Sequence, residues 1–426
     1  KLVGVEFLVN HFVMDITKIE EYVSGVVTLK KIDSTVTVYP AKAVVFAGGG
    51  YAGIYRGFST NAQDCTGDLL SVALRAGMSL KDMEFVQFHP TGLSGTGILI
   101  SEAARGEGGL LYNSLGERFM AKYAPEKMEL ASRDVVSRAI TKEVMEGRGV
   151  GPNKDSVYID LTHLGEEVIN AKLPELRDLA ITFLGLDMVK EPILIQATAH
   201  YSMGGIPTDI NGKVRKNPTE LTEGFYAAGE CACVSVHGAN RLGANSVLEA
   251  LFFGRHVGKQ IVNDAKNISF KDAKAEDAKT AVAEVEGLLY SKGQESVTKL
   301  RNELQESMTL NAGVFRTEKS LMEQKEILKG LRERFKNISI ADKSKIFNTE
   351  LQEAIELGHM LDFSMFIVEG AISRKESRGA HFRDDYTERD DENFLKHTFA
   401  YMDGDSIKLE LAPVKIGKFA PQVRSY

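Results

Sequence analysis

The chain has 426 residues, of which 43% are hydrophobic and 26% are charged, and this composition is typical of a globular protein that buries a sizeable core. It excludes collagenous, low-complexity and wholly disordered chains. The 52 basic and 59 acidic residues give a net charge of −7, which argues against a protein that binds nucleic acid through bulk charge but leaves room for a local basic pocket.

The cysteines and the hydropathy exclude further classes. Cys65, Cys231 and Cys233 are too few for a disulfide framework and lack the spacing of a metal site, so we expect no metal in the chain. No apolar run reaches the roughly 18 residues that a membrane-spanning helix needs. Any membrane association is therefore expected to come through partner subunits.

The first fifty residues alternate between apolar and polar side chains. This pattern predicts strands over Leu2–Val9, Ser24–Leu29 and Ser34–Tyr39, and the continuously apolar run Ala43–Ala47 predicts a buried parallel strand. Residues 48–53 (Gly-Gly-Gly-Tyr-Ala-Gly) formally match G-x-G-x-x-G, but no convincing helix follows them. We interpret them as a bend that brings bare backbone close to a ligand, in preference to a primary dinucleotide fingerprint.

The rest of the chain mixes helices and strands before a helical region. Residues 271–336 are rich in Ala, Glu, Lys and Leu at helical spacing and predict a helical bundle. Further buried or short strands are expected over Glu223–Gly229 and Ser406–Leu411. The remaining predicted helices are Asp68–Ala76, Ser132–Glu146, segments within Leu164–Leu184, Asn245–Asn263 and Leu351–Ser373.

Three of the nine histidines precede glycine-rich bends. His89, at the end of a predicted strand, is followed by Pro-Thr-Gly, His200 by Tyr-Ser-Met-Gly-Gly, and His237 by Gly-Ala-Asn-Arg. Such bends present side chains and bare amides to ligands. The pattern leaves two interpretations open with equal weight, a joint site or three structural histidines.

Charge placement adds two arginines and an ion pair. Glu102 and Arg105 are three positions apart, so on a helical turn they face each other, either as a surface ion pair or as part of a site. Arg133 begins a predicted helix and Arg241 precedes another. Arginines near helix starts are suited to hold carboxylates through paired donors.

Several of these stretches together resemble one family. The chain is similar to the flavoprotein subunits of succinate dehydrogenase and fumarate reductase, and the likeness runs in order through essentially the whole chain. The stretches that carry it are residues 87–92, 105–109, 131–138, 200–205, 237–246, 377–386 and 389–392.

The resemblance implies an α/β architecture with an inserted domain. Residues 1–83 and 200–264 would form an FAD-binding, Rossmann-like domain that is incomplete at its N-terminus, and residues 84–199 an inserted α+β capping domain. Residues 265–385 would form a helical bundle domain and residues 386–426 a small C-terminal domain. The family's pyrophosphate-binding segment and covalent flavin-attachment histidine would lie before Lys1.

The resemblance also implies a role for particular residues. The dicarboxylate would be bound by His89, Ser101, His200 and Arg241, with the backbone of Ala244, and His89 also counts among the catalytic residues. Arg133 would be the proton donor or acceptor, with Glu102 and Arg105 on its proton path. Ser101 stands where the family commonly has Thr, and Leu69 where it has Gly. The implied FAD contacts are Gly48, Gly49, Asp68, Glu230, Ser246 and Val247.

The implied function is the interconversion of succinate and fumarate by hydride transfer at flavin N5. Electrons would pass through an iron–sulfur subunit to or from quinone, with a membrane anchor subunit bound indirectly and no nucleic acid partner. The protein would lie on the membrane periphery, at the cytoplasmic or mitochondrial matrix face, with the periplasm left open. L-aspartate oxidase and an inactive assembly component are the alternatives; residues 241–246 and 389–392 favour the first reading over aspartate oxidase.

Overall fold

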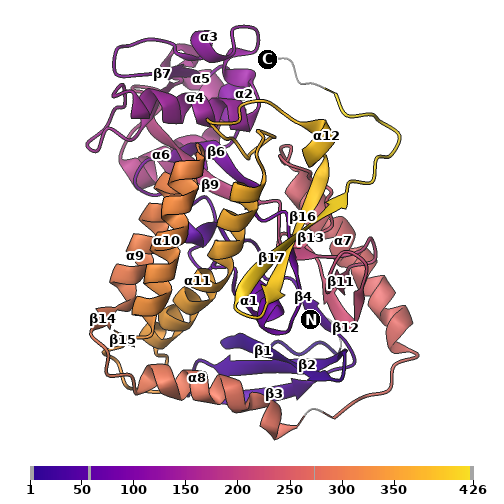
Figure 1. Ribbon diagram of the computed structural model, residues 1–426. Helices are drawn as coiled ribbons and strands as arrows, with labels where there is room; N and C mark the ends of the chain where they lie inside the picture. Colours follow the sequence, from indigo (N-terminus) through magenta and orange to yellow (C-terminus); the bar gives the residue numbers. More distant parts are fainter. Residues whose placement is uncertain (1–3, 56–58, 273, 423–426) are drawn as a thin grey trace.

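The structure is a computed structural model that describes residues 4–55, 59–272 and 274–422. Its first sheet joins segments far apart in the sequence (Figure 1). An antiparallel meander is followed by a short strand that pairs in parallel with a strand near the middle of the chain, as expected for the two buried-strand patterns. The strands of this sheet are β1 (His11–Ile19), β2 (Tyr22–Lys30), β3 (Thr35–Pro40), β4 (Val44–Phe46), β11 (Lys213–Arg215) and β12 (Leu221–Ala227).

The strand predicted over Leu2–Val9 is wrong where the chain is described. Residues 4–10 form turns and irregular chain, and the first strand begins only at His11. Val5, Phe7 and Val9 are 53%, 74% and 73% exposed, so the alternating pattern has no buried face among these residues. Strand propensity depends on a neighbouring strand and a buried face, and this segment has neither. Residues 1–3 of the prediction lie outside the described residues.

A glycine bend and a helix follow β4. The chain turns through η1 (Ala52–Ile54) and then enters α1 (Asp68–Arg75), which matches the predicted helix. Gly77 ends that segment at φ +84°, a conformation that side chains other than glycine rarely adopt. Only a single 3-10 turn follows the bend among the described residues before 56, which agrees with the bend interpretation.

A second sheet forms a separate body with its own hydrophobic core, between Leu93 and Ile195 in sequence. Its strands run in the order β6-β9-β8-β7, all antiparallel, and α4 packs against β6 and β9 (Figure 1). The elements are β6 (Val86–Leu93), α2 (Ala103–Gly106), β7 (Leu110–Tyr112), α3 (Met120–Tyr123), η2 (Met128–Leu130), α4 (Arg133–Met145), β8 (Val157–Asp160), η3 (Thr162–Leu164), α5 (Gly165–Lys172), α6 (Pro174–Leu184) and β9 (Ile193–Ser202).

Three long helices between residues 297 and 373 stand side by side, and they build most of the core that lies outside the two sheets (Figure 1). The predicted apolar series is buried, for example at Leu300, Leu304 and Leu328, and the helices begin at side-chain caps such as Asn348, whose Oδ1 accepts from the Leu351 amide at 2.8 Å. The elements of this region are η4 (Ala275–Ala278), α8 (Lys279–Leu289), β14 (Glu295–Ser296), α9 (Val297–Asn311), α10 (Glu318–Phe335), β15 (Ile338–Ser339) and α11 (Thr349–Ser373).

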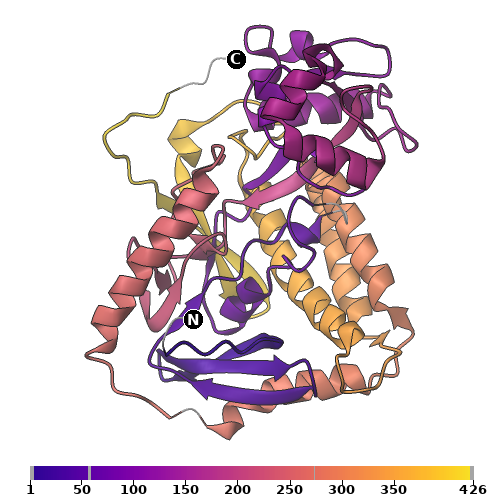
Figure 2. The same cartoon turned by 180° about the vertical axis from the view of Figure 1, so that it is seen from behind.

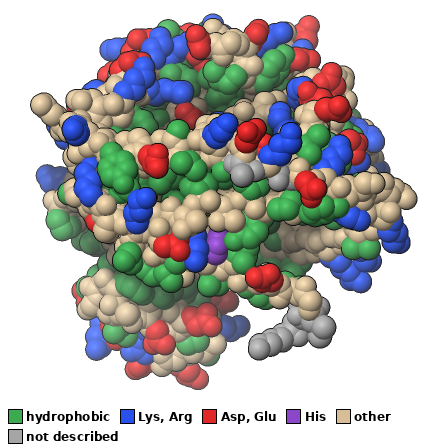
Figure 3. Space-filling view, turned by 90° about the horizontal axis from the view of Figure 1, so that it is seen from below, with side chains coloured by type: hydrophobic (Ala, Val, Ile, Leu, Met, Phe, Trp, Pro, Cys, Tyr) green, Lys and Arg blue, Asp and Glu red, His purple; other side chains and the backbone are tan. Residues whose placement is uncertain are grey.

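Helix α7 (Asn245–Ala265) lies on the opposite side of the molecule from α9, α10 and α11, as both ribbon views show (Figures 1 and 2). It packs on β12 through Phe253 and Val257. Several of its other apolar side chains remain exposed, among them Val247 at 62% and Leu251 at 70%. On the face seen in Figure 3, apolar patches are interspersed with basic and acidic side chains.

The C-terminal segment returns to the middle of the molecule as a hairpin that pairs with β5. Before it, a buried ionic network ties distant segments together. Arg374 Nε donates to Glu84 Oε1 at 2.7 Å, and both side chains are almost fully buried. None of the described helices is long and apolar enough to cross a membrane. The elements are β5 (Leu80–Lys81), β10 (Ile206–Pro207), β13 (Ala232–Cys233), α12 (Asp391–Phe394), β16 (Lys396–Asp403) and β17 (Ser406–Pro413).

Candidate active site

Two of the three singled-out histidines lie next to each other. His89 is on β6 and His200 is near the end of β9, and their ring centroids are 4.9 Å apart. His89 was expected at a strand end, but β6 continues to Leu93 through a bulge between His89 and Gly92. Pro90 has no N–H to donate to the neighbouring strand, so the strand pairing is interrupted there. The resulting bulge changes the direction of the His89 side chain.

Arg241 completes this group from the loop before α7. Its Nη2 donates to His200 Nε2 at 2.7 Å, which requires the His200 proton to be on Nδ1, where it faces Thr60 Oγ1 at 2.6 Å. The guanidinium lies 4.5 Å from the centroid of the Tyr201 ring and is only 4% exposed. Two histidines and an arginine from three separate segments therefore meet in one place.

Arg133 and Arg105 are linked by one carboxylate. Glu102 Oε2 accepts from Arg133 Nη2 at 2.9 Å and Nε at 3.1 Å, while Oε1 accepts from Arg105 Nη2 at 3.1 Å. The Arg105 side chain is 1% exposed and that of Glu102 is 45% exposed. The surface ion-pair interpretation is therefore wrong for Arg105, and the three groups form a chain that leads from the interior to solvent.

The loop before α7 lies against this chain. A Cβ placed on Gly243 would lie 3.2 Å from Glu102 Oε2 and 3.4 Å from Arg133 Nη2. Ala244, the next residue, has φ +63° and precedes the first turn of α7. Ser101 Oγ accepts from the Ala103 amide at 3.1 Å at the start of α2.

Burial and positive charge keep both histidines neutral. Burial, with the neighbouring guanidinium groups of Arg241 and Arg133, lowers the pKa of His200 to about 3. Burial and the same kind of neighbours hold the pKa of His89 well below its usual range. Neutral histidines beside several arginines, with one carboxylate among them, leave a site with surplus positive charge that suits an anion with two carboxylates.

Some buried donors in the site have no partner among the described residues. His89 Nε2, Arg241 Nε and Arg105 Nε make no hydrogen bond within the described protein. Buried polar atoms are nearly always satisfied, so each such atom calls for an explanation. At His89 and Arg241, which are in direct reach of the anion-binding group, a bound ligand is the simplest explanation.

His237 is not part of the histidine pair. Its Nε2 lies 2.7 Å from Glu249 Oε2, and Tyr201 donates to the same carboxylate. Since the Tyr201 ring also stacks on Arg241, His237 supports the site only indirectly. Sequence reasoning missed Tyr201 as well as Gln87 and Thr60, although the first two lie within or beside the histidine motifs.

The expected flavin contacts surround the glycine bend after β4. Gly49 has φ +76°, and a Cβ on Gly50 would lie 2.2 Å from Glu230 Oε1, so the carboxyl group lies directly against bare backbone. Burial raises the pKa of Glu230 to about 7. Ser246 and the exposed Val247 open the first turn of α7. Bare amides, a carboxyl group and exposed apolar surface fit a flat, partly apolar group such as a flavin.

Asp68, a predicted flavin contact, and its neighbour Leu69 already contact other groups of the protein. Asp68 Oδ2 accepts from Thr66 Oγ1 at 2.6 Å, and Oδ1 lies 2.8 Å from His359 Nδ1 on α11. A Cβ on Gly48 would meet Leu69 Cδ1 at 2.4 Å, so the leucine that replaces the family's glycine packs straight onto the bend. Asp68 therefore ties the start of α1 to α11.

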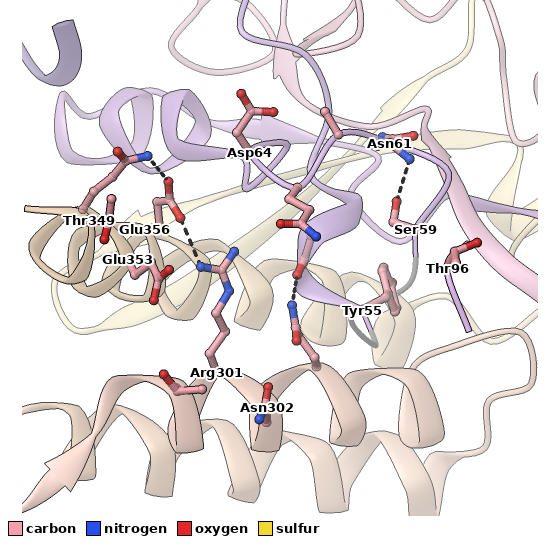
Figure 4. Close-up of a pocket in the computed structure, with 16 residues that line it drawn as sticks. Tyr55, Ser59, Asn61, Asp64, Thr96, Arg301, Asn302, Thr349, Glu353 and Glu356 are labelled. Carbon is pink, nitrogen blue, oxygen red and sulfur yellow. Dashed lines mark hydrogen bonds and ion pairs between the residues drawn. The ribbon is translucent and has the colours of Figure 1, made fainter. Parts of the chain in front are cut away.

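A polar cavity of about 440 Å³ lies elsewhere, between residues 53, 55, 59 and 61–64 on one side and helices α9 and α11 on the other (Figure 4). Within it Arg301 Nη1 donates to Glu356 Oε2 at 3.1 Å. None of the residues that the sequence predicted for the site lines this cavity. The histidine and arginine groups, and not the cavity, thus mark the candidate active site.

Comparison with known proteins decides the family. Residues 1–247 match the family model described as FAD binding domain, and residues 301–426 match that of the fumarate reductase flavoprotein C-terminus. The chain is 44% identical to the mitochondrial succinate dehydrogenase [ubiquinone] flavoprotein subunit of Oryza sativa subsp. japonica, over 99% of the chain and 68% of that protein. The chain belongs to the flavoprotein subunits of succinate dehydrogenase and fumarate reductase.

Other members of the family agree in sequence and in structure. The fumarate reductase flavoprotein subunit of Escherichia coli is 43% identical over 98% of the chain and 71% of its own length. The solved structure of FrdA from E. coli quinol fumarate reductase superposes with a TM-score of 0.89 at 41% identity, covering 97% of the chain and 72% of FrdA. The predicted family, the α/β fold with an FAD-binding domain, and FAD as cofactor are confirmed.

Proposed function

We propose that this flavoprotein subunit interconverts succinate and fumarate, with the dicarboxylate held by His89, Ser101, His200, Arg241 and the backbone of Ala244. The observation that carries the proposal is the contact of Arg241 with His200 beside His89, where buried donors are left for a ligand. One carboxylate would accept from the Arg241 guanidinium and the histidine rings. Fixing both ends of a small substrate orients its central carbons for reaction.

Proton transfer is assigned to Arg133. In the fumarate direction a carbanion-like centre develops beside a carboxylate, and an adjacent guanidinium both stabilises that charge and delivers a proton. Arginine normally stays protonated, with a pKa above about 12, but a developing carbanion is a strong enough base to take its proton. The proton would be replaced through Glu102 and Arg105, which the structure links to Arg133 in an unbroken chain.

FAD would lie at the glycine bend, in contact with Gly48, Gly49, Asp68, Glu230, Ser246 and Val247. When bound, it supplies the hydride chemistry, while the protein supplies orientation and charge. The domain division follows the same family pattern: FAD-binding residues 1–83 and 200–264, capping residues 84–199, helical residues 265–385 and C-terminal residues 386–426. The separate hydrophobic core between Leu93 and Ile195 supports the capping domain.

Electron exchange is assigned to other subunits. Among the described residues no group of three or more His, Cys, Asp or Glu is placed to hold a metal ion. We infer an iron–sulfur partner that passes electrons to or from quinone, and through it a membrane anchor. This arrangement would hold the chain at the membrane periphery, on the cytoplasmic or matrix face.

The decisive assay is dye-linked succinate oxidation and fumarate reduction by the FAD-loaded protein, with aspartate as a competing substrate. We expect turnover of succinate and fumarate and none of aspartate, because aspartate carries the same two carboxylates together with an ammonium group, which the positive site repels. Oxidation of aspartate at a rate comparable to that of succinate would contradict the proposal.

A further inference from the structure

Gln87 is a buried side chain that the proposed mechanism does not use. Its exposure is 0%, and its amide makes three hydrogen bonds. Oε1 accepts from Arg133 Nη1 at 3.2 Å, while Nε2 donates to Asn240 Oδ1 and to the Arg241 carbonyl, each at 2.7 Å. One side chain on β6 thus contacts both the proposed proton donor and the backbone of the substrate-binding arginine.

Asn240 closes this arrangement into a ring. Its Nδ2 donates to Asp134 Oδ1 at 2.9 Å, and Asp134 follows Arg133 directly in the chain. Asp134 is itself held by Ser132 Oγ at 2.7 Å and by Arg138 Nη2 at 3.2 Å. The start of α4 and the loop before α7 are therefore joined by side-chain amides on both sides of the arginine pair.

The ring fixes the plane of the Arg133 guanidinium. Glu102 holds the Nε edge and Nη2, and Gln87 holds Nη1. Among the described residues these bonds leave one N–H on Nη1 and one on Nη2 for a substrate. Arg133 Nε and Nη2 both donate to the single oxygen Glu102 Oε2, so without the bond to Gln87 the guanidinium could pivot on that oxygen.

We propose that Gln87 and Asn240 are positioning residues that set the Arg133 guanidinium at a fixed distance from the Arg241 clamp for proton transfer. This inference rests on the proposed role of Arg133. Proton transfer falls steeply with misplacement of about 1 Å, whereas binding of a dicarboxylate to Arg241 and the histidines does not need Arg133 in one plane. The amide pair should therefore act on turnover more than on affinity.

The chemistry requires an amide at position 87. A carboxylate there would still accept from Arg133, but it would turn lone pairs toward the Arg241 carbonyl, a backbone acceptor that cannot turn into a donor. It would also hold the Arg133 proton more tightly and make the guanidinium a weaker acid. Gln87→Glu should therefore fail to restore the turnover lost in Gln87→Met.

The test compares Gln87→Met, Gln87→Glu and Asn240→Ala in the FAD-loaded protein. Gln324→Met is the matched control, because Gln324 is also fully buried and bonded through its amide, to Ser307 Oγ and Asn311 Nδ2 on a remote helix. The readouts are kcat for fumarate reduction, its solvent deuterium isotope effect, and the Kd of malonate from flavin difference spectra.

We expect Gln87→Met to lower kcat by about tenfold or more, raise the isotope effect, and change the malonate Kd by less than about threefold. Asn240→Ala should act in the same direction, and the double variant should be about as slow as Gln87→Met alone. The control should stay within about twofold of wild type in every readout. If Gln87→Met does not retain FAD, the test rests on Asn240→Ala in the partly exposed loop, again by comparing the change in kcat with the change in the malonate Kd.

Two results would overturn the inference. One is a malonate Kd that rises by the same factor as kcat falls, which indicates a binding or purely structural role. The other is a kcat above about half of wild type in both single variants. Arg133→Gln distinguishes a failure of the proposed proton transfer from a failure of the positioning role. If Arg133→Gln keeps full turnover, both the proposed function of Arg133 and this inference fail. If Arg133→Gln is slow but Gln87→Met is as fast as wild type, only the positioning role fails.

Discussion

Arg133 and Arg241 carry the same group in different surroundings. Arg241 is buried between the Tyr201 ring and His200, and its free Nε has no partner among the described residues. Arg133 is held by Glu102, whose half-exposed carboxylate gives a route to solvent. A buried clamp suits constant binding of an anion, while a group connected to solvent suits repeated loss and gain of a proton.

Replacing each arginine by glutamine should separate these roles. Arg133→Gln keeps a hydrogen-bond donor but cannot deliver a proton, so we expect dicarboxylate binding within about tenfold of wild type and turnover lower by several orders of magnitude. Arg241→Gln should weaken binding by roughly 2–4 kcal/mol and also slow turnover. Difference-spectrum titration with a dicarboxylate inhibitor and steady-state fumarate reduction measure the two effects. Turnover above about a tenth of wild type in Arg133→Gln would remove it as proton carrier.

The low pKa of His200 predicts a pH dependence of stability. In the unfolded chain this histidine takes up a proton near pH 6.5, whereas in the folded chain its pKa is about 3. The unfolded state therefore binds more protons between these values, and His200 lowers stability as pH falls below about 6.5, by about 1.6 kcal/mol between pH 6.5 and pH 5. His200→Gln should lose less thermal stability than wild type over this interval.

Melting temperatures at pH 7, 6 and 5 measure the effect, with His163→Gln as the control because His163 is solvent-exposed. Equal slopes for wild type and His200→Gln would contradict a neutral, buried His200.

Residue types and spacing predicted part of the site. The spacing of Glu102 and Arg105 placed them face to face, and the structure gives a 3.1 Å ion pair. Gln87 and Arg241 could not be paired in this way, because 154 positions separate them and only the fold brings them together. Local periodicity carries no information on contacts of that range. The assignment of roles to these residues came from the resemblance and stays a prediction.

At the scale of elements, helices were easier to predict than strands. The helices predicted over Ser132–Glu146 and Leu351–Ser373 agree with α4 and α11 to within two residues. A helix closes its hydrogen bonds within one segment, so its pattern is local, whereas a strand needs a partner that the sequence does not name. The false strand at Leu2–Val9 shows the difference.

Helix α11 supports the glycine bend through one aromatic side chain. Phe363 is fully buried, its ring lies 5.4 Å from that of Tyr51, and a Cβ on Gly67 would be 2.9 Å from it. Phe363→Ala should lower the free energy of unfolding by about 3–5 kcal/mol and weaken FAD retention, because the void that the substitution leaves lies beneath the bend. Denaturant unfolding and the flavin-to-protein ratio measure this.

Phe183→Ala is the matched control, since Phe183 on α6 is 49% exposed. It should change stability by no more than about 0.5 kcal/mol. A loss of stability in Phe363→Ala with full FAD retention would show that α11 does not support the bend.

For the whole molecule, the proposed electron exchange with other subunits leads to a prediction about its assembly. The chain is similar over almost its whole length to flavoprotein subunits of succinate dehydrogenase and fumarate reductase, and we propose that electrons from its flavin pass to an iron–sulfur partner. Purification of the native protein in mild detergent should therefore recover an iron–sulfur subunit in constant ratio, detectable by its electron paramagnetic resonance signal. Recovery of a lone chain that passes electrons directly to oxygen would contradict this.

The β6–β9 pair has a mechanical consequence. These adjacent strands are the first and the last of the second sheet in chain order, and they also carry His89 and His200. Helix α4, which begins at Arg133, packs on the same two strands, and its Ser137 Oγ donates to the Phe88 carbonyl at 2.8 Å. A distortion of the β6–β9 pair would therefore displace the two histidines and Arg133 together, so that it would disturb the proposed substrate binding and the proposed proton transfer at the same time.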